Sequence, residues 1–199
     1  MDIVSFATKE VVEYANIVYE RIFDILSTPA QYPDMLWVLV PLIATTLLME
    51  FYFGVYKEEL LGWNTAFSNS LVLIFVAADL SRYLSENNLL GVDVKTLIVL
   101  VVVAGGVFLT AVDFFHLLPE RLAFNVSAKS PMNFIAIAAI LLVYSSIPLD
   151  VVTLVAFIAI FIAMLILFWI LHQSEPSVHG ELTQDAPVNE SVRKAPIKE

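Results

Sequence analysis

Cysteine is absent from the 199-residue sequence, and charged residues of both signs make up only 15% of it. Without cysteine the chain cannot form disulfides, use a thiolate nucleophile, or bind zinc or iron–sulfur clusters through thiolates. Lysine and arginine together number 10, against 20 acidic residues, so the formal net charge is −10. Nucleic-acid binding requires a basic surface that neutralises phosphates. We therefore expect no nucleic acid among the partners.

Familiar catalytic motifs are also missing from the sequence. It contains no G-x-S-x-G nucleophile elbow, no H-E-x-x-H zinc motif and no phosphate-binding loop. These absences favour a protein that is not an enzyme. Accordingly, we assign neither a catalytic residue nor a cofactor.

Long apolar segments dominate what is present, since hydrophobic residues make up 59% of the chain. An α-helix rises about 1.5 Å per residue, so about 20 apolar residues cross the ~30 Å hydrocarbon core of a bilayer. Five segments reach or approach this length: 33–53, 64–84, 94–118, 131–147 and 150–172. They predict an all-α fold, an integral membrane helical bundle of about five transmembrane helices. Such a chain would be a multi-pass protein of the cell membrane.

The two ends of the chain differ from the spans. Within 1–32, apolar residues recur every three or four positions with charged residues between them, which predicts an amphipathic N-terminal helix to about Ser27. Two prolines in the following STPAQYPD predict a linker. The helix could lie along the membrane surface, or it could pack on the protein or a partner. The polar segment 173–199 has few large apolar residues, which predicts a disordered C-terminal tail.

Several residues carry signals for the ends and contacts of the spans. Asp93 and Asp150 can cap the third and fifth spans, and Ser130 stands before Pro131 where it can cap the fourth. The glycine pair at 105–106 permits a close approach of a neighbouring backbone. Tryptophans lie near the ends of three spans, as interfacial anchors do: Trp37, Trp63 and Trp169.

Ionisable residues inside the spans are candidates for function, because a charge in the membrane is costly and usually faces the bundle interior or water. Five spans place their first and last ends on opposite sides of the membrane, called here the N-terminal side and the C-terminal side. Asp79 and Arg82 share a helix face near the N-terminal side, which predicts a local ion pair with the arginine reaching the headgroups. A proton or ion pathway through Asp79 is the alternative. The intramembrane polar candidates are Glu50, Asn64, Asn69, Asp79, Arg82, Asp113 and His116.

A second polar group lies towards the C-terminal side. Asp113, His116 and Glu120 follow an i, i+3, i+7 spacing, which places them on one face of a continuous helix. Carboxylates and imidazoles bind transition metals, so these three residues are candidates for a metal site. Ordinary polarity at a helix end that meets water is the simpler alternative.

The stretch FYFGVYKEELLGWNTAFSNS, residues 51–70, carries a resemblance to known proteins. Together with the isoleucine- and valine-rich spans and the lack of cysteine, it resembles small multi-pass membrane proteins from archaeal genomes. The resemblance implies a prokaryotic membrane, and it implies no activity.

Three functions are compatible with these features. The first is a non-enzymatic structural or interaction subunit of a membrane assembly, or a homo-oligomer, since small-residue seams suit helix association. The second is a cation or proton channel or transporter that uses an acidic stripe of Glu50, Asp79 and Asp113. The third is a metal-dependent intramembrane enzyme built on Asp113, His116 and Glu120. We favour the first, with the lipid bilayer and other membrane subunits or further copies of the chain as partners.

Overall fold

The computed structural model describes residues 3–55 and 62–174, and within these residues it contains helices and no strand. The elements in chain order are α1 Ile3–Gln31, the 3₁₀ turn η1 Pro33–Met35, α2 Leu36–Val55, α3 Trp63–Glu86, α4 Val94–Phe114, α5 Glu120–Val126, α6 Lys129–Tyr144 and α7 Val151–Ser174. The tail predicted from residue 173 lies outside the described residues, apart from the last two residues of α7.

Within the described residues, five helical segments are long and apolar enough to cross a membrane. They are Pro33–Tyr52, Trp63–Glu86, Val94–Phe114, Glu120–Tyr144 and Val151–Gln173. The fourth combines α5 and α6. The predicted all-α bundle with five candidate spans is therefore confirmed.

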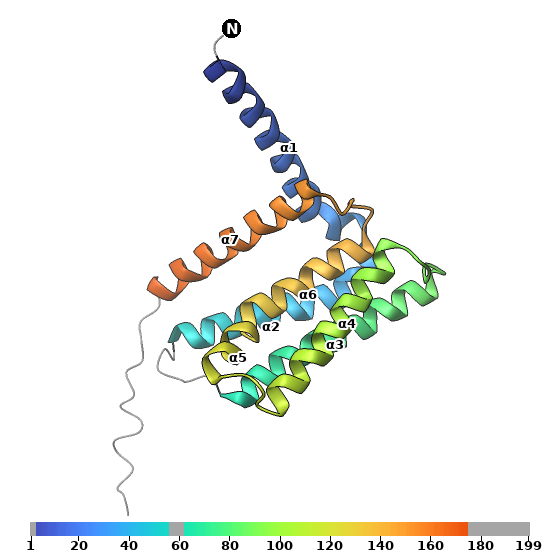
Figure 1. Ribbon diagram of the computed structural model, residues 1–199, viewed down its shortest axis with the longest axis vertical. Helices are drawn as coiled ribbons and strands as arrows, with labels where there is room; N and C mark the ends of the chain where they lie inside the picture. The colour runs from blue at the N-terminus through green and yellow to red at the C-terminus, as the bar shows by residue number, and fades with distance from the viewer. Residues whose placement is uncertain (1–2, 56–61, 175–199) are drawn as a thin grey trace, which may run out of the picture.

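Helix α6 is the centre of the bundle. Figure 1 shows it between α4 and α7, with α2 behind it and α3 beyond α4, and α2, α3 and α4 all pack on it. Its Ala136, Ile140 and Val143 are completely buried and share one apolar core with Leu80 and Leu84 of α3. Because α2, α3 and α4 all pack on α6, the rotation of α6 about its axis determines which of its side chains can meet the polar side chains of these three helices.

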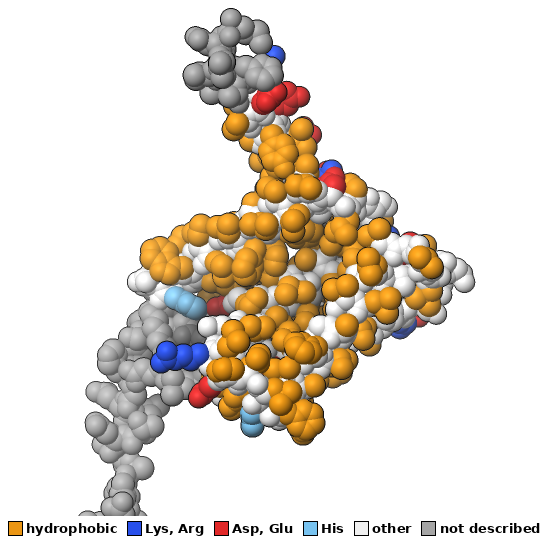
Figure 2. Space-filling model, viewed as in Figure 1, with side chains coloured by type: hydrophobic (Ala, Val, Ile, Leu, Met, Phe, Trp, Pro, Cys, Tyr) orange, Lys and Arg blue, Asp and Glu red, His pale blue; other side chains and the backbone are white. Residues whose placement is uncertain are grey.

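Helix α7 lies at the edge of the bundle and packs mainly on α1 and α2. It contacts α6 through the ring of Phe134, whose centroid lies 4.7 Å from that of Phe161 and 6.3 Å from that of Phe157. Most of its other large apolar side chains are exposed, and Figure 2 shows an apolar surface along its whole length. Such a surface suits a helix that faces lipid.

The predicted aspartate caps are confirmed. The Asp93 carboxylate accepts the backbone N–H of Thr96 at 2.9 Å, and the Asp150 carboxylate accepts that of Thr153 at 2.7 Å. Ser130 does not cap α6, because the helix already begins at Lys129. The Ser130 hydroxyl donates instead to a carboxylate of another helix, as described below.

Helix α1 extends beyond its predicted end. It continues past Ser27 and through Pro29 to Gln31. Proline lacks an N–H, but the N–H of Tyr32 still donates to the carbonyl of Thr28 at 2.9 Å, so the bonding pattern resumes after the proline. The segment expected to be a linker is therefore largely the last turn of α1.

Helix α4 ends earlier than the predicted boundary at residue 118. His116 adopts the left-handed conformation with φ of 52°, and the N–H of Leu117 donates back to the carbonyl of Val112 at 3.0 Å. This hydrogen bond is typical of the Schellman motif, in which a residue in the left-handed conformation ends a helix. This helix stop separates α4 from α5.

Gly106 allows α3 and α4 to approach closely. A Cβ atom at this position would lie 3.0 Å from the Cβ of Leu73, 3.0 Å from Cγ1 of Ile74 and 3.2 Å from the Ile74 backbone nitrogen. At Gly105 a Cβ atom would meet nothing within 4 Å. One glycine of the predicted pair therefore serves the interface, and the other does not.

We expect Gly106→Ala to lower the free energy of unfolding by about 1–3 kcal/mol, because the added methyl group must displace the backbone of α3. Gly105→Ala is the matched control and should be neutral or stabilising by up to ~1 kcal/mol through helix propensity. Unfolding in detergent micelles, followed by circular dichroism, compares the two variants. Equal stability of both would contradict the close approach at Gly106.

Candidate functional site

The polar network nearest the N-terminal side is centred on Asp79. Arg82 donates to one Asp79 oxygen at 2.7 Å and to Glu86 at 2.7 Å, so the predicted ion pair is present and is extended by a second carboxylate. The hydroxyl of Tyr144 on α6 donates to the other Asp79 oxygen at 2.9 Å, and its ring stacks on that of Tyr83 with centroids 3.9 Å apart. The sequence indicated the pair within α3 but not this bond to α6.

Asp113 forms a second network near the C-terminal side, where it is 1% exposed. The hydroxyls of Ser70 on α3 and Ser127 after α5 each donate to Asp113 Oδ2 at 2.7 Å. The side-chain amide of Asn69 donates to the Ser127 carbonyl at 2.9 Å. Among the described residues no donor reaches Asp113 Oδ1. Asp113 thus joins α4 to α3 and to the connection between α5 and α6 by short hydrogen bonds.

A third network surrounds Glu50, which is 5% exposed. Lys129 Nζ lies 3.0 Å from Glu50 Oε1, and the Ser130 hydroxyl donates to the same oxygen at 3.0 Å. His172 Nε2 lies 3.3 Å from Glu50 Oε2 and 3.1 Å from the Glu50 carbonyl oxygen. The carboxylate therefore ties α2 to the start of α6 and to the end of α7.

The three acidic residues do not form one stripe. On α3, between Ser70 of the Asp113 network and Asp79, the inward positions are the buried apolar residues Leu73, Val76 and Ala77. Glu50 has its own partners on other helices. Along the buried face of α3, apolar residues therefore separate Asp79 from the Asp113 network.

The predicted metal-site residues lie apart from one another. Asp113 is buried in α4, His116 is exposed in the helix stop, and Glu120 begins α5. The His116 ring packs instead against Trp63, with centroids 4.2 Å apart. Within the described part of the chain, no group of three histidine or acidic side chains is placed to hold a metal ion. Only a continuous helix would place these three residues on one face, and the left-handed conformation of His116 ends the helix before Glu120.

The remaining polar candidates lie on the wall of a groove or on the surface. Asn64 is exposed in the first turn of α3, and its carbonyl accepts the Ser68 hydroxyl at 2.8 Å. Asn69 and Asp79 line a groove of about 520 Å³ between α2 and α3, together with Lys129 and Asn133 from α6. From Asn69 to Asp79 the groove follows α3 for about 15 Å, roughly half the thickness of the hydrocarbon core.

Each polar side chain of this groove makes at least one hydrogen bond or ion pair within the chain. Asn133 donates to the Thr46 hydroxyl of α2 at 2.8 Å, and the Thr45 hydroxyl donates to the Pro41 carbonyl at 2.8 Å. Asn69, Asp79 and Lys129 have the partners described above. The rest of the lining is apolar and includes Phe75, whose side chain is strongly exposed. The groove therefore presents a largely apolar surface in which the polar side chains already have partners within the chain.

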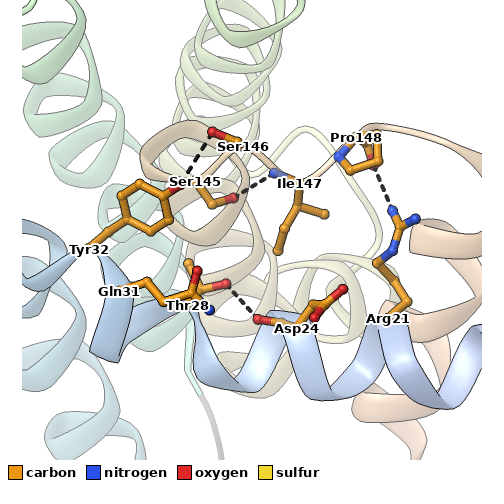
Figure 3. A pocket seen from close by; sticks show the side chains of 9 residues that line it. All are labelled: Arg21, Asp24, Thr28, Gln31, Tyr32, Ser145, Ser146, Ile147 and Pro148. Atoms are coloured by element: carbon orange, nitrogen blue, oxygen red, sulfur yellow. Dashed lines mark hydrogen bonds between the residues drawn. The ribbon is translucent and has the colours of Figure 1, made fainter.

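A smaller pocket of about 240 Å³ lies on the N-terminal side, between α1 and the α6–α7 connection (Figure 3). Arg21 of α1 lines it and reaches across to the α7 start. Its guanidinium hydrogen-bonds the Thr153 hydroxyl at 2.6 Å and lies 3.4 Å from the Asp150 carboxylate. The hydroxyls of Tyr32 and Ser146 bridge the other end of the pocket at 3.3 Å. These contacts fasten the second half of α1 to the bundle.

Comparison with models of protein families, with curated proteins and with solved structures finds no match for this chain. Functional inference therefore rests on the geometry of the networks and the groove. Residues that the sequence did not single out, such as Ser70, Ser127 and Lys129, complete the networks. Serine and lysine at these positions carry no local pattern that distinguishes them from other residues near the membrane boundary.

We expect Asp113→Ala to lower the free energy of unfolding by about 1–3 kcal/mol, because two buried hydroxyls lose their acceptor. Asp113→Asn should cost less, since its amide oxygen still accepts a hydrogen bond. Denaturant titration of the purified protein in micelles measures both. If alanine leaves the stability at the wild-type value, the network does not contribute to holding the helices together.

A pH dependence follows from the cap at the start of α7. The Thr153 N–H, and then the charge of Arg21, hold the pKa of Asp150 below its ordinary value. The stabilisation is therefore present above the unfolded value of about 3.9 and is lost as the pH falls through the lower folded value. Asp150→Asn keeps a capping side chain but does not titrate. Between about pH 6 and about pH 3 the wild-type melting temperature should fall further than that of the variant; parallel curves would rule the linkage out.

Proposed function

We propose that the protein is a non-enzymatic interaction subunit of a membrane assembly, and that the groove between α2 and α3 is its contact site for a transmembrane partner. The observation that carries the proposal is the groove itself. It has a volume of about 520 Å³ and lies along the middle of two candidate spans that each pack on α6. Packing of side chains against such a surface is what drives helix association in lipid.

The dimensions of the groove indicate how a partner would use it. The groove is lined by side chains of α2 and α3, with Lys129 and Asn133 of α6 between them. A complete α-helix with side chains is about 10–12 Å across, whereas the side chains along one of its faces form a narrow ridge. The partner therefore inserts a ridge of side chains between α2 and α3 and keeps its backbone outside, in the manner of ridges-into-grooves packing.

The chemistry of the groove supports an interaction role over the transport alternative. An ion pathway needs groups that can exchange partners with the ion. In the groove Asn69, Asp79 and Asn133 instead make hydrogen bonds within the chain. Glu50, Asp79 and Asp113 likewise accept hydrogen bonds from groups of the chain itself, and the metal-dependent enzyme lacks a shared face for its three residues.

Site-specific photocrosslinking tests this function with little background, since the chain has no native cysteine. Val72 lines the groove, whereas Val107 is an exposed residue of α4 that does not line it. Val72→Cys and Val107→Cys, each labelled with a maleimide benzophenone in native membranes, are a matched pair. We expect a discrete protein adduct several-fold more abundant from Val72, and its mass will distinguish a second copy of the chain from another subunit.

Two results of this experiment would contradict the proposal. Protein adducts of equal yield from both positions would mean that partner proteins do not contact the groove more often than other exposed apolar surfaces. Adducts with lipid alone from Val72 would mean that the groove is occupied by acyl chains and not by a partner. Thr45→Cys, on the opposite wall of the groove, provides an independent repeat.

A further inference from the structure

Helix α1 has an apolar strip that nothing in the described chain covers. Over residues 9–26 of α1, wound at 3.6 residues per turn, the acidic residues and most apolar residues fall on opposite halves of the helix; Ile17 lies on the acidic half and Tyr14 at its boundary. Val18, Ile22 and Ile25 on one edge of the apolar half pack on the bundle. The other large apolar side chains of this half are well exposed: Val11 68%, Val12 59%, Tyr19 71%, Phe23 66% and Leu26 63%.

The position of α1 relative to the spans is the second observation. Figure 1 shows α1 leaving the N-terminal side of the bundle and running crosswise to the long axes of α3, α4 and α6. Its second half is held there by Arg21, which contacts Asp150 and Thr153 at the start of α7. Trp37, the second residue of α2 and 85% exposed, is an aromatic residue of the kind that marks the headgroup level at this same end.

The two faces of α1 point in different directions relative to the lipid-facing surface. In Figure 2 the acidic side chains lie along the edge of α1 that is turned away from α7. The apolar side chains cover the side that adjoins α7, so they continue the apolar surface of that span. This continuity with an exposed apolar span favours lipid over a protein partner as the occupant of the strip.

We propose that α1 is an in-plane interfacial helix. Its apolar strip enters the acyl boundary of the leaflet on the N-terminal side, and its acidic edge faces water. Between Lys9 and Asp24 the helix carries four carboxylates against two cations, whereas interfacial helices usually have a basic polar face. Apolar burial therefore drives the contact, and anionic headgroups do not strengthen it.

The test uses the full chain reconstituted in phosphatidylcholine vesicles, with and without phosphatidylglycerol. The environment-sensitive fluorophore NBD is attached to Val12→Cys on the apolar strip or to Glu20→Cys on the acidic edge. We expect lipids spin-labelled near the top of the acyl chain to quench the Val12 probe several-fold more than the Glu20 probe. Aqueous iodide should show the reverse order, and phosphatidylglycerol should not increase the lipid quenching.

Three outcomes would overturn the proposal. Equal iodide quenching at both positions would place α1 in water. A Val12 probe shielded from both the spin-labelled lipid and iodide would mean that protein, either a second copy or another subunit, covers the strip. Stronger lipid quenching on addition of phosphatidylglycerol would mean that charge, and not apolar burial, sets the contact. A labelled Val107→Cys probe, on an exposed position of a span, controls for correct insertion.

Discussion

The arrangement of this bundle depends on one constraint: polar groups held away from water must form their hydrogen bonds within the protein. Lipid offers no hydrogen bonds, so a carboxylate in a span must find its partners within protein. Asp79 bonds to α6, Asp113 bonds to α3 and to Ser127, and Glu50 bonds to α6 and α7. These short polar bonds require the helix rotation in which each carboxylate reaches another helix.

Local features of the chain were predictable because they depend on neighbours in sequence. The lengths of the apolar runs predicted the five spans, and the side chains of Asp93 and Asp150 predicted their caps. The Asp79–Arg82 pair was predictable for the same reason, since its members stand one turn apart on α3. Each of these relations is determined by helix geometry over a few residues.

Contacts between helices were not predictable from one sequence. Tyr144 lies 65 residues from Asp79, Ser130 lies 80 from Glu50, and His172 lies 122 from Glu50. Nothing in the local pattern says which faces of α2, α6 and α7 meet. The metal-site hypothesis lacks support for a local reason. The left-handed residue His116 ends the helix, so the three candidate residues do not share the one helix face that they were expected to share. The groove likewise arises only from how α2 and α3 flank α6, so the sequence offered no signal for it.

Helix α7 has an unusual set of attachments, with polar contacts at its two ends and ring contacts near its middle. Its first turn is held by Arg21 of α1, and its last turn by Glu50 of α2. Helix α7 therefore links α1 to the start of α6 through the Glu50–Lys129 ion pair. If α1 lies in the interface as proposed, a change in bilayer thickness or curvature that tilts it would displace the start of α7. The displacement would reach a buried ion pair at the opposite end of the bundle.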